Sequence, residues 1–272
     1  RLRRRRRQLN LTVKLMGVVN VTPDSFSDGG KYLDAQAAIT HGKELLREGA
    51  EILDVGGEST RPGADPVGES EELRRVVPVV ESLAGEGAVS IDTSKAAVAA
   101  AAIYAGATML NDVTALRGDA TMAGLCAERG VDVVLMHMPG NPRTMQDDPR
   151  YDDVVGDIKA FLAERVEYAL ASGIAEERIW LDPGIGFGKT LEHNLELLRR
   201  LGELCELGRP LVIGASRKSF IGKVDGSAVD DRIGGSLAAA VLAAAEGADV
   251  LRVHDVAATA QALAVARAVV DA

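Results

Sequence analysis

The sequence has little cysteine and no long apolar run, and both shortages narrow the kinds of protein it can encode. Its two cysteines, Cys126 and Cys205, stand far apart, without a CxxC pair and outside any cluster of histidine and cysteine. A disulfide framework and a zinc site are therefore not expected, and both thiols are predicted to be small buried hydrophobes. No apolar stretch approaches the roughly 18 to 20 residues that cross a bilayer, and the N-terminal segment lacks the apolar core of a secretory signal. We expect a cytoplasmic protein.

Charge is distributed unevenly along the 272 residues. The net charge is -9, although residues 1–10 hold a run of arginines. A like-charged block at a terminus is usually solvated, so we predict a disordered basic tail there, with a nucleic-acid or membrane arm as the less favoured alternative. The acidic remainder is a poor binder of nucleic acid. No Pro/Ser-rich linker divides the chain, so residues 11–272 are expected to form one domain, without nucleic-acid or membrane partners.

From Lys14 onward, short β-branched runs alternate with longer stretches rich in Ala, Leu and Glu. This alternation indicates parallel strands joined by right-handed helical crossovers. We count eight such units, with strands expected at residues 15–20, 52–55, 89–92, 109–113, 131–137, 179–182, 211–214 and 250–253. Eight units in about 260 residues predict an α/β fold, a single (β/α)8 TIM barrel whose active site lies at the C-terminal ends of the strands.

Two helical stretches carry apolar residues at the three-to-four spacing of one buried face. These residues are Leu73, Val76, Val77, Val80 and Leu83 in the first stretch, and Leu195, Leu198, Leu201 and Leu204 in the second. Glycines that follow helical stretches and precede strands are predicted to be helix stops. They are Gly49, Gly106, Gly130, Gly173 and Gly247.

Polar residues stand at the C-terminal end of nearly every expected strand. They are Asn20, Glu58, Asp92, Asn111, Asp112, His137, Asp182, Ser216, Arg217, Lys218, Arg252 and His254. Any one of them could simply cap the following helix. Such residues at nearly all the strand ends are harder to explain as caps, and cations near a helix N-terminus oppose its dipole. Arg217 and Lys218 are therefore expected to face an anionic or strongly polar ligand.

The segment Gly184–Thr190, GIGFGKT, has only a superficial likeness to a nucleotide-binding loop. A P-loop needs four residues between its glycines before GK, and the position that would complete the pattern is Pro183. We interpret this run as a flexible barrel loop after Asp182, which the proline keeps extended at the end of its strand.

Two long segments carry a family resemblance, MGVVNVTPDSFSDGG at residues 16–30 and DVGGESTRPG at residues 54–63. They resemble the signatures of the dihydropteroate synthases, and the likeness extends from about Lys14 to the C-terminus. Shorter motifs in matching order are Ser90–Thr93, Asn111–Val113, Asp182–Lys189, Ser216–Ser219 and Arg252–Asp255. The resemblance implies a transferase that condenses 6-hydroxymethyl-7,8-dihydropterin pyrophosphate with p-aminobenzoate, giving 7,8-dihydropteroate and pyrophosphate in folate biosynthesis.

By this resemblance, the pterin-binding residues are Asp92, Asn111, Met136, Asp182, Gly214, Lys218 and Arg252. The residue types suit the ligand, because carboxylates and an amide accept hydrogen bonds from the N–H groups of the pterin edge and an ammonium donates to its acceptors. Arg252 is expected to stack on the ring face. The competing interpretation of Asp92 and Asp182 is a structural ion pair with Lys218.

The resemblance also implies where the other substrate groups bind. The pyrophosphate contacts are Asn20, Arg61, Arg252 and His254, and Asn20 is also the expected ligand of a Mg²⁺ cofactor, an ion that takes few protein oxygens. A core histidine is the alternative for His254. The p-aminobenzoate contacts, which form a sulfonamide target in this family, are Pro23, Phe26, Thr60, Pro62, Ser216 and Lys218.

The implied mechanism needs no covalent nucleophile: pyrophosphate departs first, and the arylamine then attacks the pterin methylene carbon. The expected catalytic residues are Asp92, Asp182, Lys218, Arg61 and His254. Two alternatives stay open, a pterin-binding paralogue without activity and a methyltetrahydrofolate-binding methyltransferase, which has no pyrophosphate to bind. A homodimer is expected from the resemblance, and the Ala-rich stretches at residues 237–245 and 256–270 could form its interface.

Overall fold

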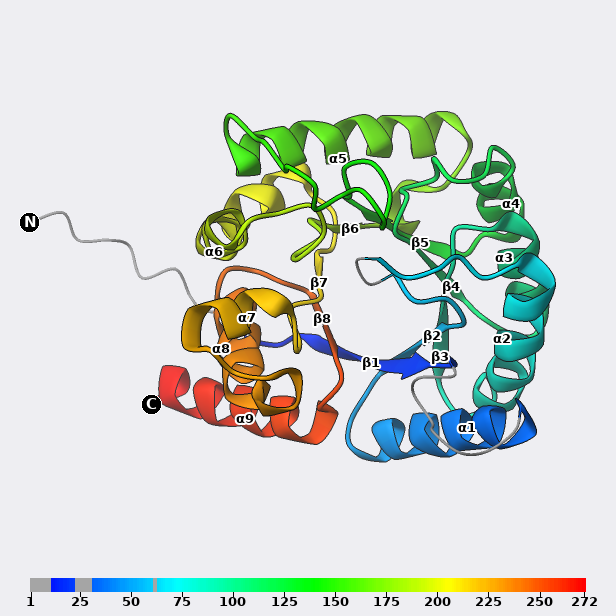
Figure 1. Ribbon diagram of the computed structural model, residues 1–272, viewed down its shortest axis with the longest axis horizontal. Helices are drawn as coiled ribbons and strands as arrows, with labels where there is room; N and C mark the ends of the chain where they lie inside the picture. Colours follow the sequence, from blue (N-terminus) through cyan, green and yellow to red (C-terminus); the bar gives the residue numbers. More distant parts are fainter. Residues whose placement is uncertain (1–10, 23–30, 61–62) are drawn as a thin grey trace, which may run out of the picture.

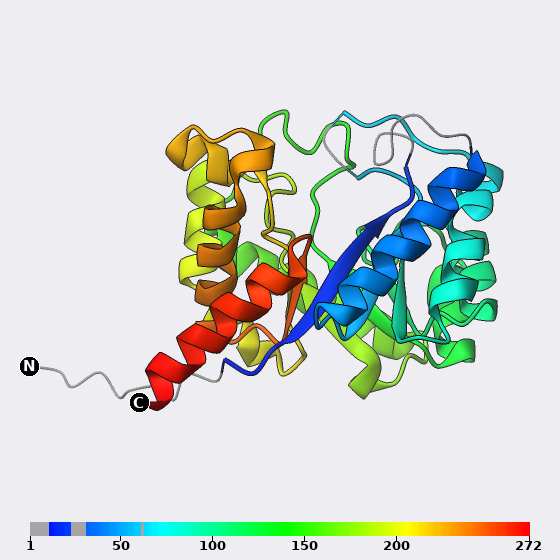
Figure 2. The ribbon, with the colours of Figure 1, turned by 90° about the horizontal axis from the view of Figure 1, so that it is seen from below.

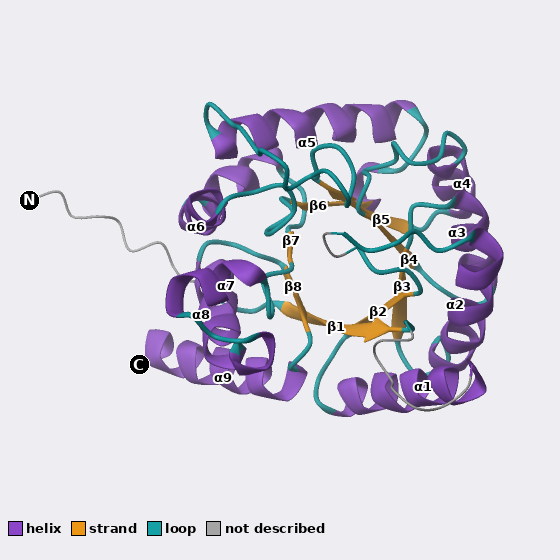
Figure 3. Cartoon of the chain, viewed as in Figure 1, coloured by secondary structure: helices purple, strands orange, loops and turns teal. Residues whose placement is uncertain are grey.

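The computed structural model describes residues 11–22, 31–60 and 63–272. Eight parallel strands alternate with helices in this part of the chain, and the helices surround the strands as an outer ring (Figures 1 and 3). The strands are β1 (Lys14–Asn20), β2 (Ile52–Gly56), β3 (Ala88–Asp92), β4 (Met109–Asp112), β5 (Asp132–Met136), β6 (Ile179–Asp182), β7 (Val212–Ile213) and β8 (Val250–Val253). The predicted tail at residues 1–10 lies outside the described residues.

The helices follow the strands in regular order. They are α1 (Lys31–Arg47), α2 (Glu69–Leu83), α3 (Ala96–Tyr104), α4 (Met122–Arg129), α5 (Val154–Ala171), α6 (Leu191–Arg199), α7 (Ser219–Asp225), α8 (Ile233–Ala245) and α9 (Val256–Asp271). Short 3₁₀ helices add η2 (Glu176–Arg178), η3 (Leu201–Leu207) and η4 (Val229–Asp231). Among the described helices, none has both the length and the apolar character that a bilayer crossing requires.

The strands form one sheet in the order β6-β5-β4-β3-β2-β1-β8-β7. Its two edges meet at a single parallel bridge between Leu181 and Leu211, where the N–H of Leu181 donates to the carbonyl of Pro210 at 2.9 Å. The predicted (β/α)8 barrel is thereby confirmed. Figure 2 shows the loops that follow the strands gathered at one end of the barrel, away from the C-terminus.

Three strands are shorter than predicted, for local reasons. β4 ends at Asp112 because the carboxylate of Asp112 accepts hydrogen bonds from the N–H groups of Thr114 and Leu116, at 2.8 Å each, and so starts a turn. β5 covers residues 132–136 instead of 131–137. β7 keeps only two residues, because Leu211 belongs to the closing bridge and the chain leaves the sheet after Ile213.

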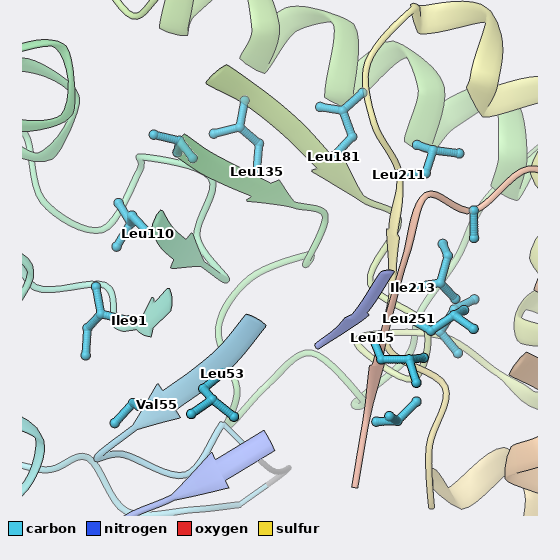
Figure 4. Close-up of a cluster of buried hydrophobic side chains, with 14 of the residues drawn as sticks. Leu15, Leu53, Val55, Ile91, Leu110, Leu135, Leu181, Leu211, Ile213 and Leu251 are labelled. Carbon is cyan, nitrogen blue, oxygen red and sulfur yellow. The ribbon is translucent and has the colours of Figure 1, made fainter. Parts of the chain in front are cut away.

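Alternation along each strand separates two apolar layers. Outward-facing residues pack under the helices in the main core, and Figure 4 shows Leu53, Ile91, Leu110, Leu135 and Leu251 in this layer. Inward-facing residues fill the lower part of the barrel as a second cluster of Met16, Ile52, Met109, Val134, Val212 and Val250, with Trp180 against it. Four of the next inward positions towards the strand ends carry polar side chains, Asp54, Asn111, Asp182 and Arg252, and these form part of the site described below.

The predicted apolar faces are right in part. On α2, Val76, Val80 and Leu83 are fully buried. On α6 the prediction was wrong for Leu195, which is 44% exposed. The buried face of α6 is formed by Asn194, Leu197 and Leu198, and Leu195 lies off this face. Residues three apart stay on one face only in the 3₁₀ helix that follows α6.

The helix stops are confirmed. All five of these glycines have positive φ, and Gly130 at 59° ends α4 in the left-handed conformation that glycine adopts without a Cβ clash. No disulfide joins the two cysteines; Cys126 is buried as predicted, whereas Cys205 is only half-buried.

Candidate functional site

A buried charged cluster lies inside the barrel where β2, β3, β4 and β8 approach their C-terminal ends. Arg252 donates from Nε to Oδ2 of Asp54 at 2.6 Å and from Nη2 to Oδ2 of Asp92 at 3.0 Å. Asn111 donates from Nδ2 to the same Asp54 oxygen at 3.0 Å. One guanidinium and one amide are thus held by two carboxylates from neighbouring strands.

Burial governs the protonation of this cluster. Asp54 is fully buried, and Asp92 and Asn111 are 8% and 5% exposed. Burial raises the pKa of Asp92 to about 8, the neighbouring charge of Asp54 acts in the same direction, and Arg252 opposes both. Burial works to lower the pKa of Arg252, but the charges of Asp54 and Asp92 outweigh it and raise that pKa.

The opposite side of the barrel supplies Asp182 from β6 and Lys218 from the loop after β7. Burial raises the pKa of Asp182, while the nearby Lys218 and a 2.6 Å hydrogen bond from the N–H of Gly184 act against the rise. Loss of water around the ammonium lowers the pKa of Lys218 to about 8, although Asp182 stabilises its charge. Within the described part of the chain, Lys218 forms no ion pair with Asp92 or Asp182; Asp92 pairs with Arg252.

Lys218 also contacts the loop between β6 and α6. Its ammonium donates to the carbonyl of Ile185 and lies 4.6 Å from the ring centroid of Phe187. Gly186, with φ at 84°, makes this approach possible, because a Cβ there would stand 2.9 Å from Cδ of Lys218. On its other side, Lys218 lies next to Gly214, where an added Cβ would be 3.7 Å from Nζ and 3.8 Å from Arg252. Lys218 and Arg252 therefore flank Gly214.

The loop of residues 184–189 was predicted to be flexible, but its polar groups are held from several sides. Side chains that donate to its carbonyl oxygens include Lys218 to Ile185, Gln146 to Gly186, Lys189 to Phe187 and Tyr151 to Gly188. In addition, Asn194 accepts from the N–H of Gly186 at 2.7 Å. A loop whose backbone is bonded in this way is an ordered wall for the site.

Lys189 is the most deeply buried cation of this region, with 2% exposure. Its Nζ lies 3.0 Å from Nδ1 of His137 and donates to the carbonyl of Phe187 at 2.8 Å. Burial lowers the pKa of Lys189 well below its ordinary value. Burial and the Lys189 charge also lower the pKa of His137, to about 2, so His137 is a neutral core residue.

At the end of β8, His254 meets the loop that follows β7. Its N–H donates to Oγ of Ser216 at 3.3 Å, and its Nδ1 lies 3.0 Å from the same oxygen. The sequence interpretation of Arg217 as a ligand-facing cation is wrong, since both Nε and Nη2 donate to the carboxylate of Asp255, at 3.0 and 2.5 Å. Only Lys218 of that pair turns towards the barrel.

The second signature is anchored at both ends of its loop by Glu58. Oε1 of Glu58 accepts from the N–H of Val67 at 2.8 Å, and Oε2 accepts from Lys95 at 2.6 Å. Lys95 is held in turn by the fully buried Glu72 of α2, at 2.5 Å. This arrangement fixes the base of the loop that carries Thr60, which is half-buried.

Comparison with known proteins agrees with this geometry. The profile of the family described as pterin binding enzyme matches residues 16–254. The dihydropteroate synthase of Escherichia coli K12 is 47% identical over 260 residues, which cover 95% of this chain and 92% of the relative. The structure of Xanthomonas albilineans dihydropteroate synthase with 4-aminobenzoic acid has 52% identity and a TM-score of 0.89, covering 94% of this chain and 93% of that chain.

A second structure of the Xanthomonas albilineans enzyme, in complex with 7,8-dihydropteroate, has 48% identity and a TM-score of 0.86, again covering 94% of this chain and 93% of that chain. The chain belongs to the dihydropteroate synthase family. The family predicted from the two signatures is confirmed, and with it the class of enzyme, a transferase.

As a member of the dihydropteroate synthase family, the chain places its predicted residues in three groups. Arg252 bonds Asp92 directly, and Asn111 joins this group through Asp54, whose carboxylate accepts from both Asn111 and Arg252. Asp182 and its register partner Met136 lie on the neighbouring strands β6 and β5. Ser216 with His254, Lys218 beside Gly214, Asn20 at the end of β1 and Thr60 make up the rest of the described set, and Asn20 is half-buried beside Gly56. The other predicted residues, Pro23, Phe26, Arg61 and Pro62, lie outside the described residues.

Two side chains with central positions were not singled out from the sequence. Asp54 was noted only as part of the second signature, and Phe187 only as part of a loop motif. The sequence carries a signal for Asp54, because a charged residue stands in the middle of the otherwise apolar run ILDVG. For Phe187 no such signal exists, since its contact with Lys218 joins two loops through the fold.

Proposed function

We propose that this chain condenses 6-hydroxymethyl-7,8-dihydropterin pyrophosphate with p-aminobenzoate, releasing pyrophosphate and forming 7,8-dihydropteroate. The observation that carries the proposal is the arrangement of Asp92, Asn111, Asp182 and Lys218 around one end of the barrel. In addition, the similar Xanthomonas albilineans enzyme has been seen with 4-aminobenzoic acid and with 7,8-dihydropteroate.

The pterin would bind to polar atoms that have no partner within the described part of the chain. Oδ1 of Asp92 and Oδ1 of Asn111 are both buried hydrogen-bond acceptors of this kind. A buried acceptor without a hydrogen bond costs free energy, so a ligand that offers N–H donors to these two oxygens gains binding energy. Asp182 would accept further N–H groups, and Lys218 would donate to the pterin carbonyl and ring nitrogen.

Three more residues would shape the pterin pocket. Met136 would pack against the ring, Gly214 would leave space for it between the two cations, and Arg252 would cover its face. Asp54 and Asp92 fix the guanidinium of Arg252, so a ring can stack on an already oriented plane.

We propose that Arg61, Arg252 and His254 bind the leaving pyrophosphate, and that Asn20 holds Mg²⁺ through its side-chain oxygen. In the described part of the chain, no group of three or more His, Cys, Asp or Glu residues could enclose a metal. A single neutral amide at the end of β1 fits an ion that obtains most of its ligands from phosphate and water. Bound there, Mg²⁺ would supply positive charge beside the departing phosphates.

The order of events follows from charge. Departure of pyrophosphate leaves a cation at the pterin methylene carbon, delocalised into the ring, and the nitrogen of the arylamine then attacks this carbon. Asp92 and Asp182 would stabilise the cation by fixed electrostatics, without a covalent intermediate on the protein. Pro23, Phe26, Thr60, Pro62, Ser216 and Lys218 would form the site for p-aminobenzoate.

We also propose that the chain forms a homodimer through α8 and α9. Several large apolar side chains of these helices are exposed, among them Leu242 at 59%, Val265 at 62% and Val269 at 73%. Burying such a surface between two copies would remove it from water. Sedimentation analysis of the wild type beside Leu242→Glu tests this, and a wild type that is monomeric at micromolar concentration would exclude the dimer.

A cytoplasmic location is proposed for the enzyme as well. No disulfide joins Cys126 and Cys205, which suits a reducing compartment. Fractionation of the source cells, with the protein detected by an antibody, tests this proposal.

The proposed reaction is tested with purified protein, the pterin pyrophosphate, p-aminobenzoate and Mg²⁺, by measuring dihydropteroate and released pyrophosphate. We expect product from the wild type, and its loss both in Lys218→Ala and after chelation with EDTA, with activity restored by added Mg²⁺. Tight binding of the pterin pyrophosphate without product would instead support a non-catalytic pterin-binding paralogue. Methyl transfer from methyltetrahydrofolate by the same preparation would support a methyltransferase.

A further inference from the structure

The carboxylate of Asp54 occupies the centre of the buried cluster, between the side chains of Asn111 and Arg252. It is fully buried on β2 and accepts through one oxygen, Oδ2, from both Asn111 and Arg252. A charged side chain buried this deeply is costly unless its partners compensate for the lost water. The two partners are also residues expected to contact the pterin, which suggests that the position of Asp54 serves the ligand.

The contact with Asn111 decides which way the Asn111 amide faces. Because Nδ2 donates to Asp54, the oxygen Oδ1 is turned away from it, and this oxygen is buried without a partner in the described part of the chain. Without Asp54, the amide could rotate by half a turn and present its NH₂ group where the oxygen now stands. An N–H group of a ligand would then meet a donor instead of an acceptor.

The contact with Arg252 has a related consequence. Arg252 divides its donors between Asp54 and Asp92, so Oδ2 of Asp92 is occupied while Oδ1 is buried and has no partner among the described residues. Asn111 and Asp92 are register partners on neighbouring strands. Each of these two neighbouring positions therefore keeps one buried oxygen without a partner among the described residues.

We propose that Asp54 is a positioning residue that fixes the Asn111 amide so that it accepts hydrogen bonds from the N–H donors of the pterin edge. The proposal deepens the proposed function and rests on it, because the N–H donors are those of the pterin. In this role Asp54 acts through Asn111, with its own second oxygen, Oδ1, buried and without a partner among the described residues. The oriented Asn111 amide favours a ligand whose edge carries adjacent N–H groups. It disfavours a ligand that places a hydrogen-bond acceptor next to Asn111.

The test uses two substitutions of Asp54. Asp54→Ala removes the acceptor, and we expect the KM for the pterin pyrophosphate and its dissociation constant in calorimetry to rise by about tenfold or more. Asp54→Asn removes the charge but keeps an oxygen of the same shape, so it should retain most of the affinity. The KM for p-aminobenzoate, at saturating pterin pyrophosphate, should stay within about twofold in both variants.

The decisive variant is the double substitution Asp54→Ala with Asn111→Asp. A carboxylate presents an oxygen in either rotation, so residue 111 no longer needs to be oriented, and pterin affinity should recover to within about threefold of the wild type. A purely structural role of Asp54 predicts no such recovery. The proposal would be overturned if the double variant folded normally, as judged by a wild-type circular dichroism spectrum and a cooperative melt, but did not regain pterin affinity. An unchanged dissociation constant in Asp54→Ala would overturn it as well.

Ser90→Ala is the matched control. Ser90 is the register partner of Asp54 on β3, is fully buried, and has no hydrogen bond from its side chain within the described residues. Its removal should leave the affinity for the pterin pyrophosphate unchanged. Calorimetry separates this proposal from the proposed function, since a wild type that binds the pterin without making product refutes the reaction and still allows the role of Asp54 to be measured.

Discussion

The ammonium of Lys218 lies 4.6 Å from the ring centroid of Phe187, and the same ammonium donates to the carbonyl of Ile185 in the loop that carries Phe187. The loop of the neighbouring β/α unit therefore positions the ammonium of Lys218, whereas the loop after β7 carries the residue itself. Its place in the site depends on two connections that are distant in sequence.

Replacing Phe187 by Leu should weaken the binding of the pterin pyrophosphate. A cation–π contact of this kind contributes about 0.5 to 2 kcal/mol, which corresponds to a rise in KM of about two- to thirtyfold. Phe187→Tyr keeps an aromatic ring and should stay close to the wild type. Equal KM values for Phe187→Leu and the wild type would show that the ring does not position Lys218.

The anchor at Glu58 makes a prediction for the second substrate. Glu58→Gln weakens the connection to Lys95, so the loop that follows Glu58 should lose its fixed base. We expect the KM for p-aminobenzoate to rise about three- to tenfold, with pterin affinity little changed. Glu86→Gln is the control, because Glu86 pairs with Lys43 of α1 and follows the C-terminal end of α2, whereas this loop precedes the N-terminal end of α2. Steady-state kinetics with each substrate varied in turn give both constants, and parallel changes in the two variants would contradict the prediction.

Lys189 predicts a pH dependence of stability. Because burial lowers its pKa in the folded state, the unfolded chain binds one more proton than the folded chain between that lowered pKa and the ordinary value of 10.5. The free energy of unfolding should therefore rise with pH in this window, by up to about 1.4 kcal/mol per pH unit for this residue. Lys189→Met removes the contribution. Denaturant unfolding at pH 7, 8 and 9 should show the wild type gaining stability relative to the variant, and a constant difference would mean that Lys189 keeps its proton on folding.

Asp92 and Lys218 together predict how kcat/KM for the pterin pyrophosphate depends on pH. The pKa values of both are about 8 in the free enzyme. The charged form of Asp92 increases as pH rises through 8, and the charged form of Lys218 decreases, so the profile should be bell-shaped with its maximum near pH 8. The guanidinium in Lys218→Arg stays protonated, so the alkaline limb should move to higher pH. Asp92→Asn should remove the acidic limb. Limbs that stay in place in these variants would assign the titration to other groups.

Much of the fold could be predicted from the sequence, because alternation of short and long apolar patterns reports directly on strands and crossover helices. Leu195 shows where this fails, since an abrupt change from an α-helix to a 3₁₀ helix leaves no mark on the residue spacing. For the site, the sequence shows which polar residue stands at the end of each strand, but it does not show which of these residues contact one another. Arg217 shows this most clearly, because its partner Asp255 becomes visible only when the end of β8 is placed beside the loop after β7.

The weakest strand pairing of the barrel, between β6 and β7, lies beside the site. A single bridge, Leu181 to Leu211, joins these strands, and Asp182 and Lys218 stand on opposite sides of it. A ligand bound by both residues would link the two edges of the sheet and stabilise the closure of the barrel. We therefore expect the amide of Leu181 to exchange its hydrogen more slowly once the pterin pyrophosphate is bound, so that filling the pocket also completes the wall of the barrel.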